Sequence, residues 1–493
     1  MRTDHVIIVG IDGLRPDQVN EQTMPNLAAM KARGVSSANH RTVFPSETRG
    51  ALTALANGAR PAQTGILGNV FYARGDDPAL TRTDTLHDWH ANDDALPGGY
   101  VTATSLGETL AKAGMTLAVV TSSGQGSFTA LSWKGDQWGN VGFNVRHPQI
   151  AYPHDIAASI EGTHKVPSGG FDRGAETKAV EIFIQSVWPA VLPEASIIWL
   201  TEVDSASHKF GLGSEGQLET MKSCDAAIGA LLEWRDSQPN AQDILIMVTS
   251  DHGHVTSGES VDVARALREA GIKVDSNFAG DADILLRRGR TPGLWLRKAD
   301  PGLLTSATQI LAAQPWYGAC FTRPLASDPM QPSVEGTLSM ALTGADHQRA
   351  PDLYLEMAGN NSANEHGVGG TAYLDAGSYT TLQGGGTHGG MHWSELSAVL
   401  IADGALVKKG SVLNTRTGIY DLAPTILHLL GVKPPATMSG RALLDLFEGE
   451  PVAPVESQTF EASLNGKTSK LTVSTVADRM YLDHAGDGPS ASA

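Results

Sequence analysis

Aspartate and histidine side chains occur at four places where they could bind metal ions together. Three of these places closely follow a short apolar run, and the fourth is the glycine-rich stretch GGGTHGG. Carboxylate oxygen and imidazole nitrogen suit zinc, with manganese or iron as a second choice. Three aspartates and three histidines predict two divalent ions, which can clamp the attacking and leaving oxygens of a phosphoryl centre. The residues are Asp12, Asp204 with His208, Asp251 with His252, and His388.

Each motif alone has an ordinary structural explanation. Asp12 can belong to a plain turn, His388 can be a loop histidine beside glycines, and an Asp–His pair at positions i and i+4 can arise by chance. Asp251 and His252 are more informative, because consecutive polar residues directly after a buried strand rarely serve packing. The four motifs in one chain favour a metal site over unrelated coincidences.

A hydroxyl group that could act as a nucleophile lies between His40 and Asn69. Pro45 and Ser46 indicate a turn before Thr48, and the following run RGALTALANG predicts a short helix. At the first turn of that helix the hydroxyl would lie beside free N–H groups and a partial positive charge, which suits phosphate. Thr48 alone would more often be a helix cap, but the metal-ligand motifs favour a chemical role.

Short β-branched apolar runs precede the polar residues, and helical segments separate the runs. We expect strands at residues 6–11, 116–121, 195–200 and 243–249, each buried on both faces. Their alternation with helices predicts an α/β fold with a mostly parallel sheet covered on both sides. Ligands of such sheets bind at the carboxyl ends of the strands. Residues 122–170 show no regular pattern.

The pattern changes between residues 255 and 376, where short strands alternate with glycine-rich links. Because this region separates two ligand motifs, we interpret it as an inserted cap or lid subdomain. Asn465-Gly466 predicts a β-hairpin near the C-terminus. The expected units are a catalytic core of residues 1–254 and 377–450, the cap of residues 255–376, a hairpin extension of residues 451–483 and a disordered tail of residues 484–493.

The chain has 493 residues and a formal net charge of −17. An acidic surface argues against binding a nucleic-acid duplex, because a phosphate backbone demands a basic surface. It does not exclude a small phosphate ester as substrate, since bound metal ions can reverse the local charge. The sequence is also compatible with a homo-oligomer.

Only Cys224 and Cys320 are present, which is no disulfide framework and fits a reducing compartment. The N-terminal apolar run is too short for a secretion signal, and no stretch approaches the roughly 20 apolar residues that span a bilayer. We therefore expect a cytoplasmic protein without a membrane segment. The expectation changes to periplasmic or secreted if a signal peptide once preceded this sequence.

Seven segments carry a resemblance to a known superfamily. They are VGIDGLRPD, MPNLAAMKARG, GARPAQTGILGN, EVDSASHKFG, TSDHGH, GGGTHGG and DLAPTILHLLGVKPPATMSGRALL. In this order they make the chain similar to the alkaline phosphatase superfamily, and within it to the nucleotide pyrophosphatase/phosphodiesterase group, the type I phosphodiesterases. The resemblance covers most of the expected core and implies an alkaline-phosphatase-like three-layer sandwich.

The resemblance also implies two metal sites, with Thr48 as both a ligand and the attacking group. The implied activity is hydrolysis of a phosphodiester or pyrophosphate bond. Thr48 would attack phosphorus, a covalent phospho-threonine would form, and water would displace it. The implied ligands are Asp204, His208 and His388 for one ion, and Asp12, Asp251, His252 and Thr48 for the other.

Thr48 is chosen over two nearby hydroxyl residues by its spacing to a family motif. In the family the nucleophile lies ten residues before the glycine of a TG…P…HGI stretch, and Gly58 followed by Pro61 matches that stretch here. Ser46 and Thr42 stay as alternatives to Thr48.

The sequence departs from the family pattern next to the nucleophile. An asparagine expected three residues after it, which would donate to a phosphate oxygen, is replaced by Ala51. Arg49 could supply the missing donor through a bidentate grip on the non-bridging oxygens, or could point into solvent. The sulfatase branch is disfavoured because neither cysteine lies near Thr48, and the phosphoglycerate mutase branch uses a serine and a larger insertion.

Two other functions stay open. A phosphomonoesterase, or a phosphonate hydrolase similar to phosphonoacetate hydrolase, could use the same core. Monoesters carry one more charge than diesters, so the pocket would want an extra cation such as Lys134 or Arg49. An inactive binding protein of the same fold is the second alternative, and retention of all six expected ligands argues against it. Residues 71–99 and the expected cap would select the substrate.

Overall fold

A computed structural model describes residues 2–74, 77, 79–166, 170–376, 383–486 and 488–489. Its centre is an eight-stranded sheet with the strand order β23-β2-β22-β9-β1-β8-β6-β7. Only the pairs β2-β22 and β22-β9 are antiparallel, so the expected mostly parallel sheet is confirmed. The strands are β1 (His5–Ile11), β2 (Val35–Ser37), β6 (Leu117–Thr121), β7 (Val141–Asn144), β8 (Ala195–Leu200), β9 (Ile244–Thr249), β22 (Leu400–Asp403) and β23 (Ser411–Leu413).

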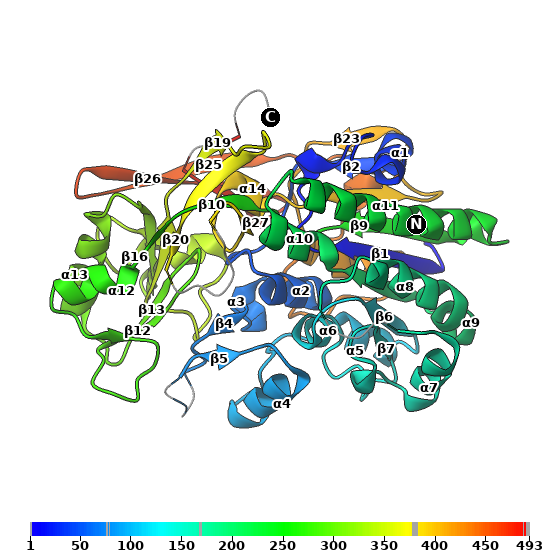
Figure 1. The fold of residues 1–493 in the computed structure, drawn as a ribbon, viewed down its shortest axis with the longest axis horizontal. Coiled ribbons are helices and arrows are strands. Elements are labelled where there is room, and N and C mark those ends of the chain that lie inside the picture. Colours follow the sequence, from blue (N-terminus) through cyan, green and yellow to red (C-terminus); the bar gives the residue numbers. More distant parts are fainter. Residues whose placement is uncertain are drawn as a thin grey trace.

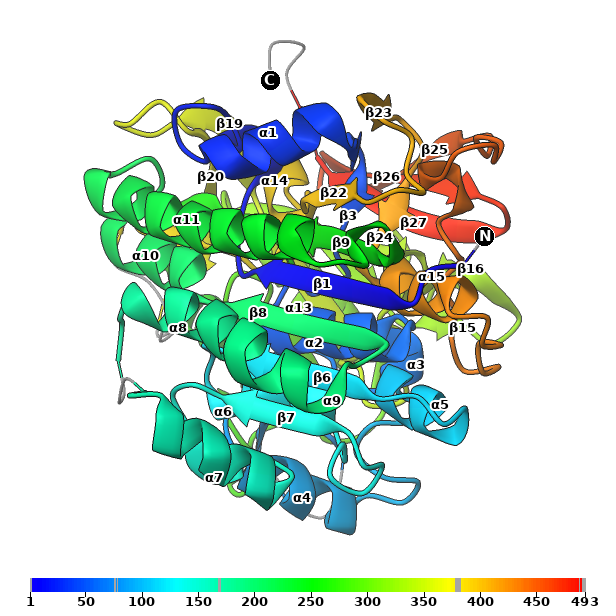
Figure 2. The ribbon, with the colours of Figure 1, turned by 90° about the vertical axis from the view of Figure 1, so that its right-hand side faces the viewer.

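Alternate side chains of β1 pack into two separate cores, one on each face of the sheet. Ile7 and Val9 belong to one core, and Val6 and Ile8 belong to the other. Figure 2 shows helices in front of the sheet and behind it, which makes the α/β sandwich of three layers. The front layer holds α1 (Pro25–Arg33), α8 (Gly174–Ile182), α9 (Trp188–Val191) and α11 (Glu215–Ser237), and the rear layer holds α2 (Thr48–Asn57), α5 (Leu106–Lys112), α6 (Gln125–Ser132) and α15 (Leu422–Leu429).

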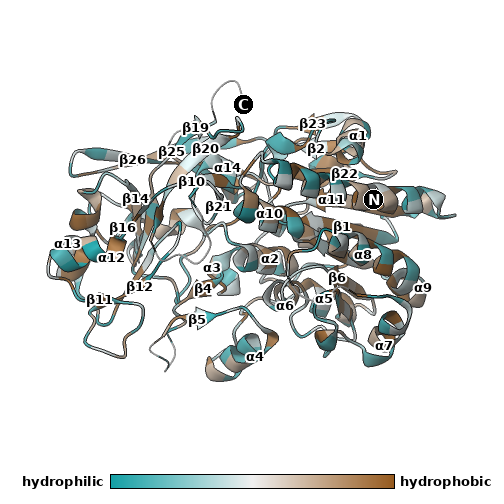
Figure 3. Cartoon of the chain, in the orientation of Figure 1, coloured by the Kyte–Doolittle hydropathy of each residue, from teal (hydrophilic) through white to brown (hydrophobic). Residues whose placement is uncertain are grey.

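Hydropathy follows this layering. Figure 3 shows the strands of the central sheet mainly in the hydrophobic colours, whereas the outer helices are mixed. The strands are buried on both faces and are therefore apolar throughout, while each helix needs only one apolar stripe.

Residues 122–170 are more regular than the sequence predicted. They contain α6, the edge strand β7 and α7 (His154–Thr163), while residues 167–169 lie outside the described part. The pattern was missed because β7 has only 4 residues and α6 only 8. Such short elements contain too few positions to show a periodicity.

A second sheet lies beside the core on the left of Figure 1, with the strand order β11-β12-β13-β18-β14-β17. It shares a hydrophobic core with α12 (Val263–Glu269) and α13 (Pro301–Ala312). All of these elements come from the region interpreted as a cap. The strands are β11 (Val274–Asp275), β12 (Ile284–Arg287), β13 (Gly293–Leu296), β14 (Tyr317–Thr322), β17 (Leu338–Ser339) and β18 (Leu353–Met357).

A four-stranded sheet, β19-β20-β10-β21, contacts the second sheet where β20 meets β18. Its strand β21 is followed directly by His388 and the rest of the glycine-rich loop. The first residues of the expected late core, 377–382, lie outside the described part. The strands are β10 (Val255–Val261), β19 (Gly359–Ala363), β20 (Gly369–Asp375) and β21 (Gly386–Thr387).

The C-terminal region forms three antiparallel strands, β25 (Glu456–Leu464), β26 (Lys467–Val476) and β27 (Arg479–Ala485). Asn465 and Gly466 join β25 to β26 with positive φ angles of 51° and 76°, as the two-residue hairpin turn requires. Strand β27 includes two residues that the sequence interpretation placed in the tail. Residues 487 and 490–493 of that tail lie outside the described part.

The remaining elements are short and connect the larger ones. The helices are α3 (Pro61–Thr64), α4 (Leu86–Ala95), α10 (Glu202–Phe210) and α14 (Trp393–Leu396), and the strand pairs are β3 (His40–Arg41) with β24 (Thr417–Gly418), β4 (Val70–Phe71) with β5 (Thr81–Arg82), and β15 (Pro324–Leu325) with β16 (Asp328–Pro332).

Candidate metal centre

The carboxyl ends of three neighbouring strands bring the predicted site residues together. Asp12 follows β1, Asp204 lies in α10 shortly after β8, and Asp251 follows β9. Because β9, β1 and β8 are adjacent in the sheet, these residues meet at one edge. His388 reaches the same place from the loop after β21.

Three histidines direct their Nε2 atoms at one carboxylate oxygen, Asp204 Oδ1. The Nε2 atoms of His254, His208 and His388 lie 3.0, 3.3 and 3.7 Å from this oxygen. The Nδ1 atoms of the same rings lie 2.9, 2.7 and 2.8 Å from backbone carbonyl oxygens. Since a carbonyl only accepts, each Nδ1 donates its proton to a carbonyl, which leaves each Nε2 directed at the carboxylate. In a neutral ring this nitrogen presents a lone pair to a cation that lies between ring and carboxylate, and in a protonated ring it donates to the carboxylate.

His252 repeats this arrangement on a second group of ligands. Its Nδ1–H donates to the carbonyl of the next residue at 3.0 Å. Its Nε2 lies 3.3 Å from Asp251 Oδ2, 3.5 Å from Asp12 Oδ1 and 3.3 Å from Thr48 Oγ1. The rings of His252 and His388 stack with centroids 3.6 Å apart, so the two groups adjoin.

The candidate ligand atoms suit divalent metal ions. Four of them are buried without a hydrogen-bond partner among the described residues, although buried polar atoms normally have one. A cation shared by these oxygen and nitrogen atoms would satisfy them together. The four atoms are Asp12 Oδ1, Asp204 Oδ1, Asp251 Oδ2 and His254 Nε2.

The structure groups the ligand atoms differently from the sequence prediction. One group contains ligand atoms of Asp204, His208, His254 and His388, and the other contains ligand atoms of Asp12, Asp204 and His252. Within each group these atoms lie within 4.8 Å of one another. His254 was missed, although TSDHGH offered it as a second histidine. Asp251 is in neither group, although its Oδ2 lies 3.3 Å from His252 Nε2. Its Oδ1 accepts from the N–H groups of Gly13 and His252 at 3.0 and 3.1 Å.

Burial strongly shifts the pKa values of Asp12, Asp251 and His252. Burial, with the charges of Asp251 and Asp204, raises the pKa of Asp12 well above its ordinary value. Burial also raises the pKa of Asp251 to about 7 and lowers that of His252 to about 3. For Asp204 burial acts upward, but neighbouring histidines outweigh it and hold the pKa below its ordinary value. A bound divalent ion would replace the protons that Asp12 and Asp251 otherwise retain.

Thr48 is the first residue of α2, after the N-cap residue Glu47, which confirms its predicted place at a helix start. The first N–H groups of a helix have no partner within the helix and can bind an anion. Ser46 differs from Thr48, because its hydroxyl is already bound to the loop of His388, at 2.8 and 3.0 Å. Thr42 forms no described hydrogen bond with a predicted metal ligand, and its hydroxyl is buried without a partner.

Asn69 is a second residue that the sequence interpretation missed. Its Oδ1 accepts from the N–H of Arg49 at 3.0 Å, at the start of α2, and the described residues provide no partner for its side-chain NH₂. Ala51, where an asparagine was expected, is fully buried within α2. Arg49 does not extend into solvent, since its guanidinium lies 3.2 Å from Asp84.

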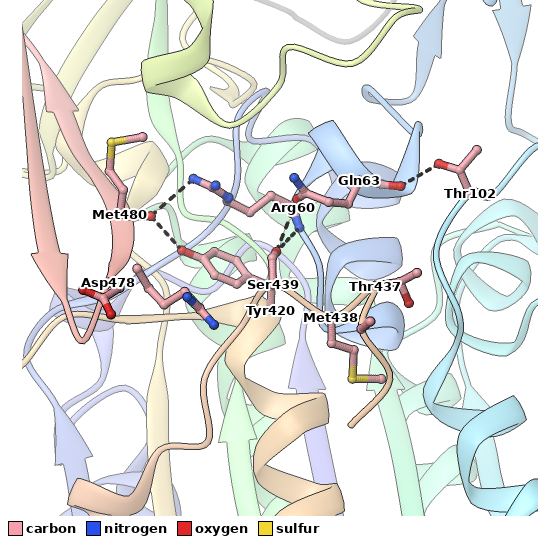
Figure 4. A pocket seen from close by; sticks show the side chains of 11 residues that line it. Arg60, Gln63, Thr102, Tyr420, Thr437, Met438, Ser439, Asp478 and Met480 are labelled. Carbon is pink, nitrogen blue, oxygen red and sulfur yellow. Dashed lines mark hydrogen bonds between the residues drawn. The ribbon is translucent and has the colours of Figure 1, made fainter. Parts of the chain in front are cut away.

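A cavity of about 520 Å³ lies at the other end of α2, and its lining includes Arg60 and Tyr420 (Figure 4). One lining residue, Ser439, donates its N–H to the carbonyl of Gly58 directly after α2, at 2.9 Å. Helix α2 has 10 residues, which at 1.5 Å per residue span about 15 Å. None of the predicted metal ligands lines this cavity, so the candidate site lies elsewhere.

A comparison with known protein families decides the identity. A model of the type I phosphodiesterase/nucleotide pyrophosphatase family matches residues 6–391, which include every predicted ligand. The chain belongs to this family. A search of curated proteins found no match.

Type I phosphodiesterases belong to the alkaline phosphatase superfamily, so the predicted resemblance and α/β fold are confirmed. The family is a metal-dependent group of phosphoric ester hydrolases, which confirms the predicted enzyme class and fits small-molecule phosphate esters as substrates. Among the helices of the described part, none is long and apolar enough to cross a membrane.

Proposed function

We propose that this phosphodiesterase-family chain hydrolyses phosphodiester or pyrophosphate bonds through a covalent phospho-threonine at a two-metal site. The observation that carries the proposal is the convergence of four histidine Nε2 atoms and three aspartates beside the Thr48 hydroxyl. Buried side chains with only a packing role normally have hydrogen-bond partners for their polar atoms. Three carboxylate oxygens and His254 Nε2 instead have none among the described residues.

Two divalent ions would occupy the site, with zinc preferred over manganese or iron. When bound, they supply positive charge to the phosphoryl oxygens and lower the pKa of the Thr48 hydroxyl. The proposed ligands are Asp204, His208 and His388 for one ion, and Asp12, Asp251, His252 and Thr48 for the other. His254 would support the ion beside Asp204, either as a ligand or by orienting Asp204.

Thr48 is the attacking group in this proposal. Its Oγ forms a bond to phosphorus while the bond from phosphorus to the leaving oxygen breaks, and the hydroxyl proton passes through water to that leaving oxygen. Water then attacks the phospho-threonine, the bond between phosphorus and Thr48 Oγ breaks, Thr48 Oγ takes up a proton from the attacking water, and the phosphate product leaves. The N–H groups at the start of α2 stabilise the negative charge on the non-bridging oxygens.

Asn69 is our candidate for the donor that Ala51 cannot supply. Its side-chain oxygen is occupied by the N–H of Arg49, which holds the amide NH₂ at the start of α2, where it can donate to a phosphate oxygen. Arg49 suits this role less well than the sequence suggested, because its guanidinium is paired with Asp84.

A phosphomonoesterase or phosphonate hydrolase is the alternative. A monoester brings one more negative charge than a diester. Both cations considered for that charge are already paired, Arg49 with Asp84 at 3.2 Å and Lys134 with Asp93 at 2.6 Å. This pairing favours the less charged diester. An inactive binding protein is disfavoured because the ligands and the hydroxyl are all retained and gathered.

The deciding experiment combines metal analysis with a substrate series. Bis-p-nitrophenyl phosphate, p-nitrophenyl phosphate and p-nitrophenyl sulfate are compared on protein with known metal content. We expect two ions per chain and diester turnover well above monoester turnover. Faster monoester turnover would support the alternative. Absence of turnover on all three esters with both ions bound would overturn the proposed function.

A further inference from the structure

Residues 287–291 of the expected cap, which we call the arginine loop, contact two turns of the candidate site. The loop begins at the last residue of β12 and ends shortly before β13. Arg287 and Arg290 are buried. Arg288 is partly exposed and pairs instead with two aspartates of the cap itself.

Arg287 forms an ion pair with Glu47, the residue directly before Thr48. The other oxygen of this carboxylate, Oε2, accepts from the backbone N–H of Asn69 at 2.6 Å. Glu47 therefore connects the turn before α2 to the segment that carries Asn69. Arg287 fixes the position of that carboxylate and balances its charge in a buried place.

Arg290 acts on the loop that carries His388. Its guanidinium lies 2.7 Å from Glu356 and 3.0 Å from Glu395. Glu395 Oε1 in turn accepts from the N–H of Gly390 at 2.9 Å. All of these charged groups are buried, so the ion pairs are shielded from water, and removing the cation would leave two uncompensated carboxylates.

Thr291 adds a direct contact to the same loop. Its hydroxyl donates to the carbonyl of Gly389 at 2.8 Å. The packing is close, because a Cβ atom at Gly390 would lie 2.7 Å from the Cζ of Arg290. Both residues that follow His388 are therefore held by the arginine loop, directly or through a carboxylate.

We propose that Arg287 and Arg290 are positioning residues for the two catalytic turns, and that the cap is thereby a fixed part of the site. Arg290 sets the place of His388 and with it the affinity for one metal ion. Arg287 sets the place of Glu47 and with it those of Thr48 and Asn69. The inference rests on the proposed function, which gives these turns their roles.

Metal affinity tests the role of Arg290 without any substrate. The variant Arg290→Gln is titrated with Zn²⁺ against a chromophoric chelator. We expect one ion to bind about 10–100-fold more weakly, as when other supports of metal ligands are removed, and the second ion to bind as before. Arg290→Lys should recover part of the loss, because it keeps the charge without the fork that binds two carboxylates.

If Arg290→Gln does not fold, the metal titration is carried out on Thr291→Val instead. This substitution removes the hydroxyl that donates to the carbonyl of Gly389 at 2.8 Å and also lies 3.3 Å from Glu356 Oε2. Loss of about one hydrogen bond predicts about a fivefold weaker ion. Wild-type affinity for both ions in a folded Arg290→Gln protein would overturn the role of Arg290 in metal binding. If that variant does not fold, wild-type affinity in Thr291→Val would overturn the role of the arginine loop.

Turnover of bis-p-nitrophenyl phosphate tests Arg287. We expect Arg287→Gln to lower kcat about 100-fold, the effect of a misplacement near 1 Å, with KM little changed and both ions bound. Arg288→Gln is the matched control, since it removes the same charge from the same loop without touching either turn. It should resemble the wild type in kcat and in metal affinity.

Unchanged kcat in Arg287→Gln would overturn the role of that residue. Losses in Arg288→Gln as large as those of its neighbours would show general destabilisation and overturn both positioning roles. If the wild-type protein hydrolyses none of the esters, the proposed function fails, and the metal titrations still decide the role of Arg290.

Discussion

The substitution Asn69→Ala tests how the site holds phosphate. It removes the oxygen that accepts from the N–H of Arg49 at 3.0 Å, and also the NH₂ group proposed to donate to the substrate. The first loss leaves an N–H at a helix start without an acceptor. That resembles loss of a helix cap and costs about 1 kcal/mol of the free energy of unfolding. The second loss removes a donor directed at developing negative charge, which lowers kcat about 10²–10³-fold.

Two measurements separate these effects. Urea unfolding reports the change in stability, and hydrolysis of bis-p-nitrophenyl phosphate at matched metal content reports the change in kcat. Asn69→Asp is the matched control, because it keeps an acceptor for the N–H of Arg49 but replaces the donor with a carboxylate. We expect it to be nearly as stable as the wild type and at least as slow as Asn69→Ala. A kcat close to the wild-type value in Asn69→Ala would refute the donor role.

Four further predictions concern the candidate metal ligands and the nucleophile. Thr48→Ala should remove turnover while the fold is retained by circular dichroism, and full activity would assign the attack to a neighbouring hydroxyl. His388→Ala should weaken one ion selectively in a metal titration, whereas equal loss of both would contradict the two ligand sets. His254→Gln should weaken the ion beside Asp204 about 10–100-fold, and unchanged affinity would leave His254 a packing role. Burial raises the pKa of Asp251 to about 7, so the ion must displace at least one proton below that pH, and its affinity should fall at least about tenfold per unit as pH drops from 7 to 5. A pH-independent affinity in calorimetry would contradict this.

The central sheet and the convergence of most candidate ligands at its edge could be predicted because their signals are local. Strands β1, β8 and β9 are continuous apolar runs, and their polar ligands follow within a few residues. Parallel strands place such ends at one edge without further information.

The contacts that complete the site could not be predicted because they are tertiary. Asn69 lies beside Arg49 only after the chain has turned back through α3, whereas local spacing pointed to Ala51. Arg287 and Arg290 stand in a short polar link between two strands, which resembles a solvent-exposed turn. Their burial depends on carboxylates contributed by distant segments.

The carbonyls that orient three of the histidines belong to Gly13, Ser46 and Gly386. Contacts between such distant parts of the chain form late in folding, because long loops must close first. The unfolded chain therefore has no preformed site, and divalent ions at the proposed site would bind the native state alone. A free-ion concentration a thousand times Kd would then add about 4 kcal/mol for each bound ion to the free energy of unfolding. Metal supply would thus set how much folded protein persists in a cell, as well as how fast each molecule turns over.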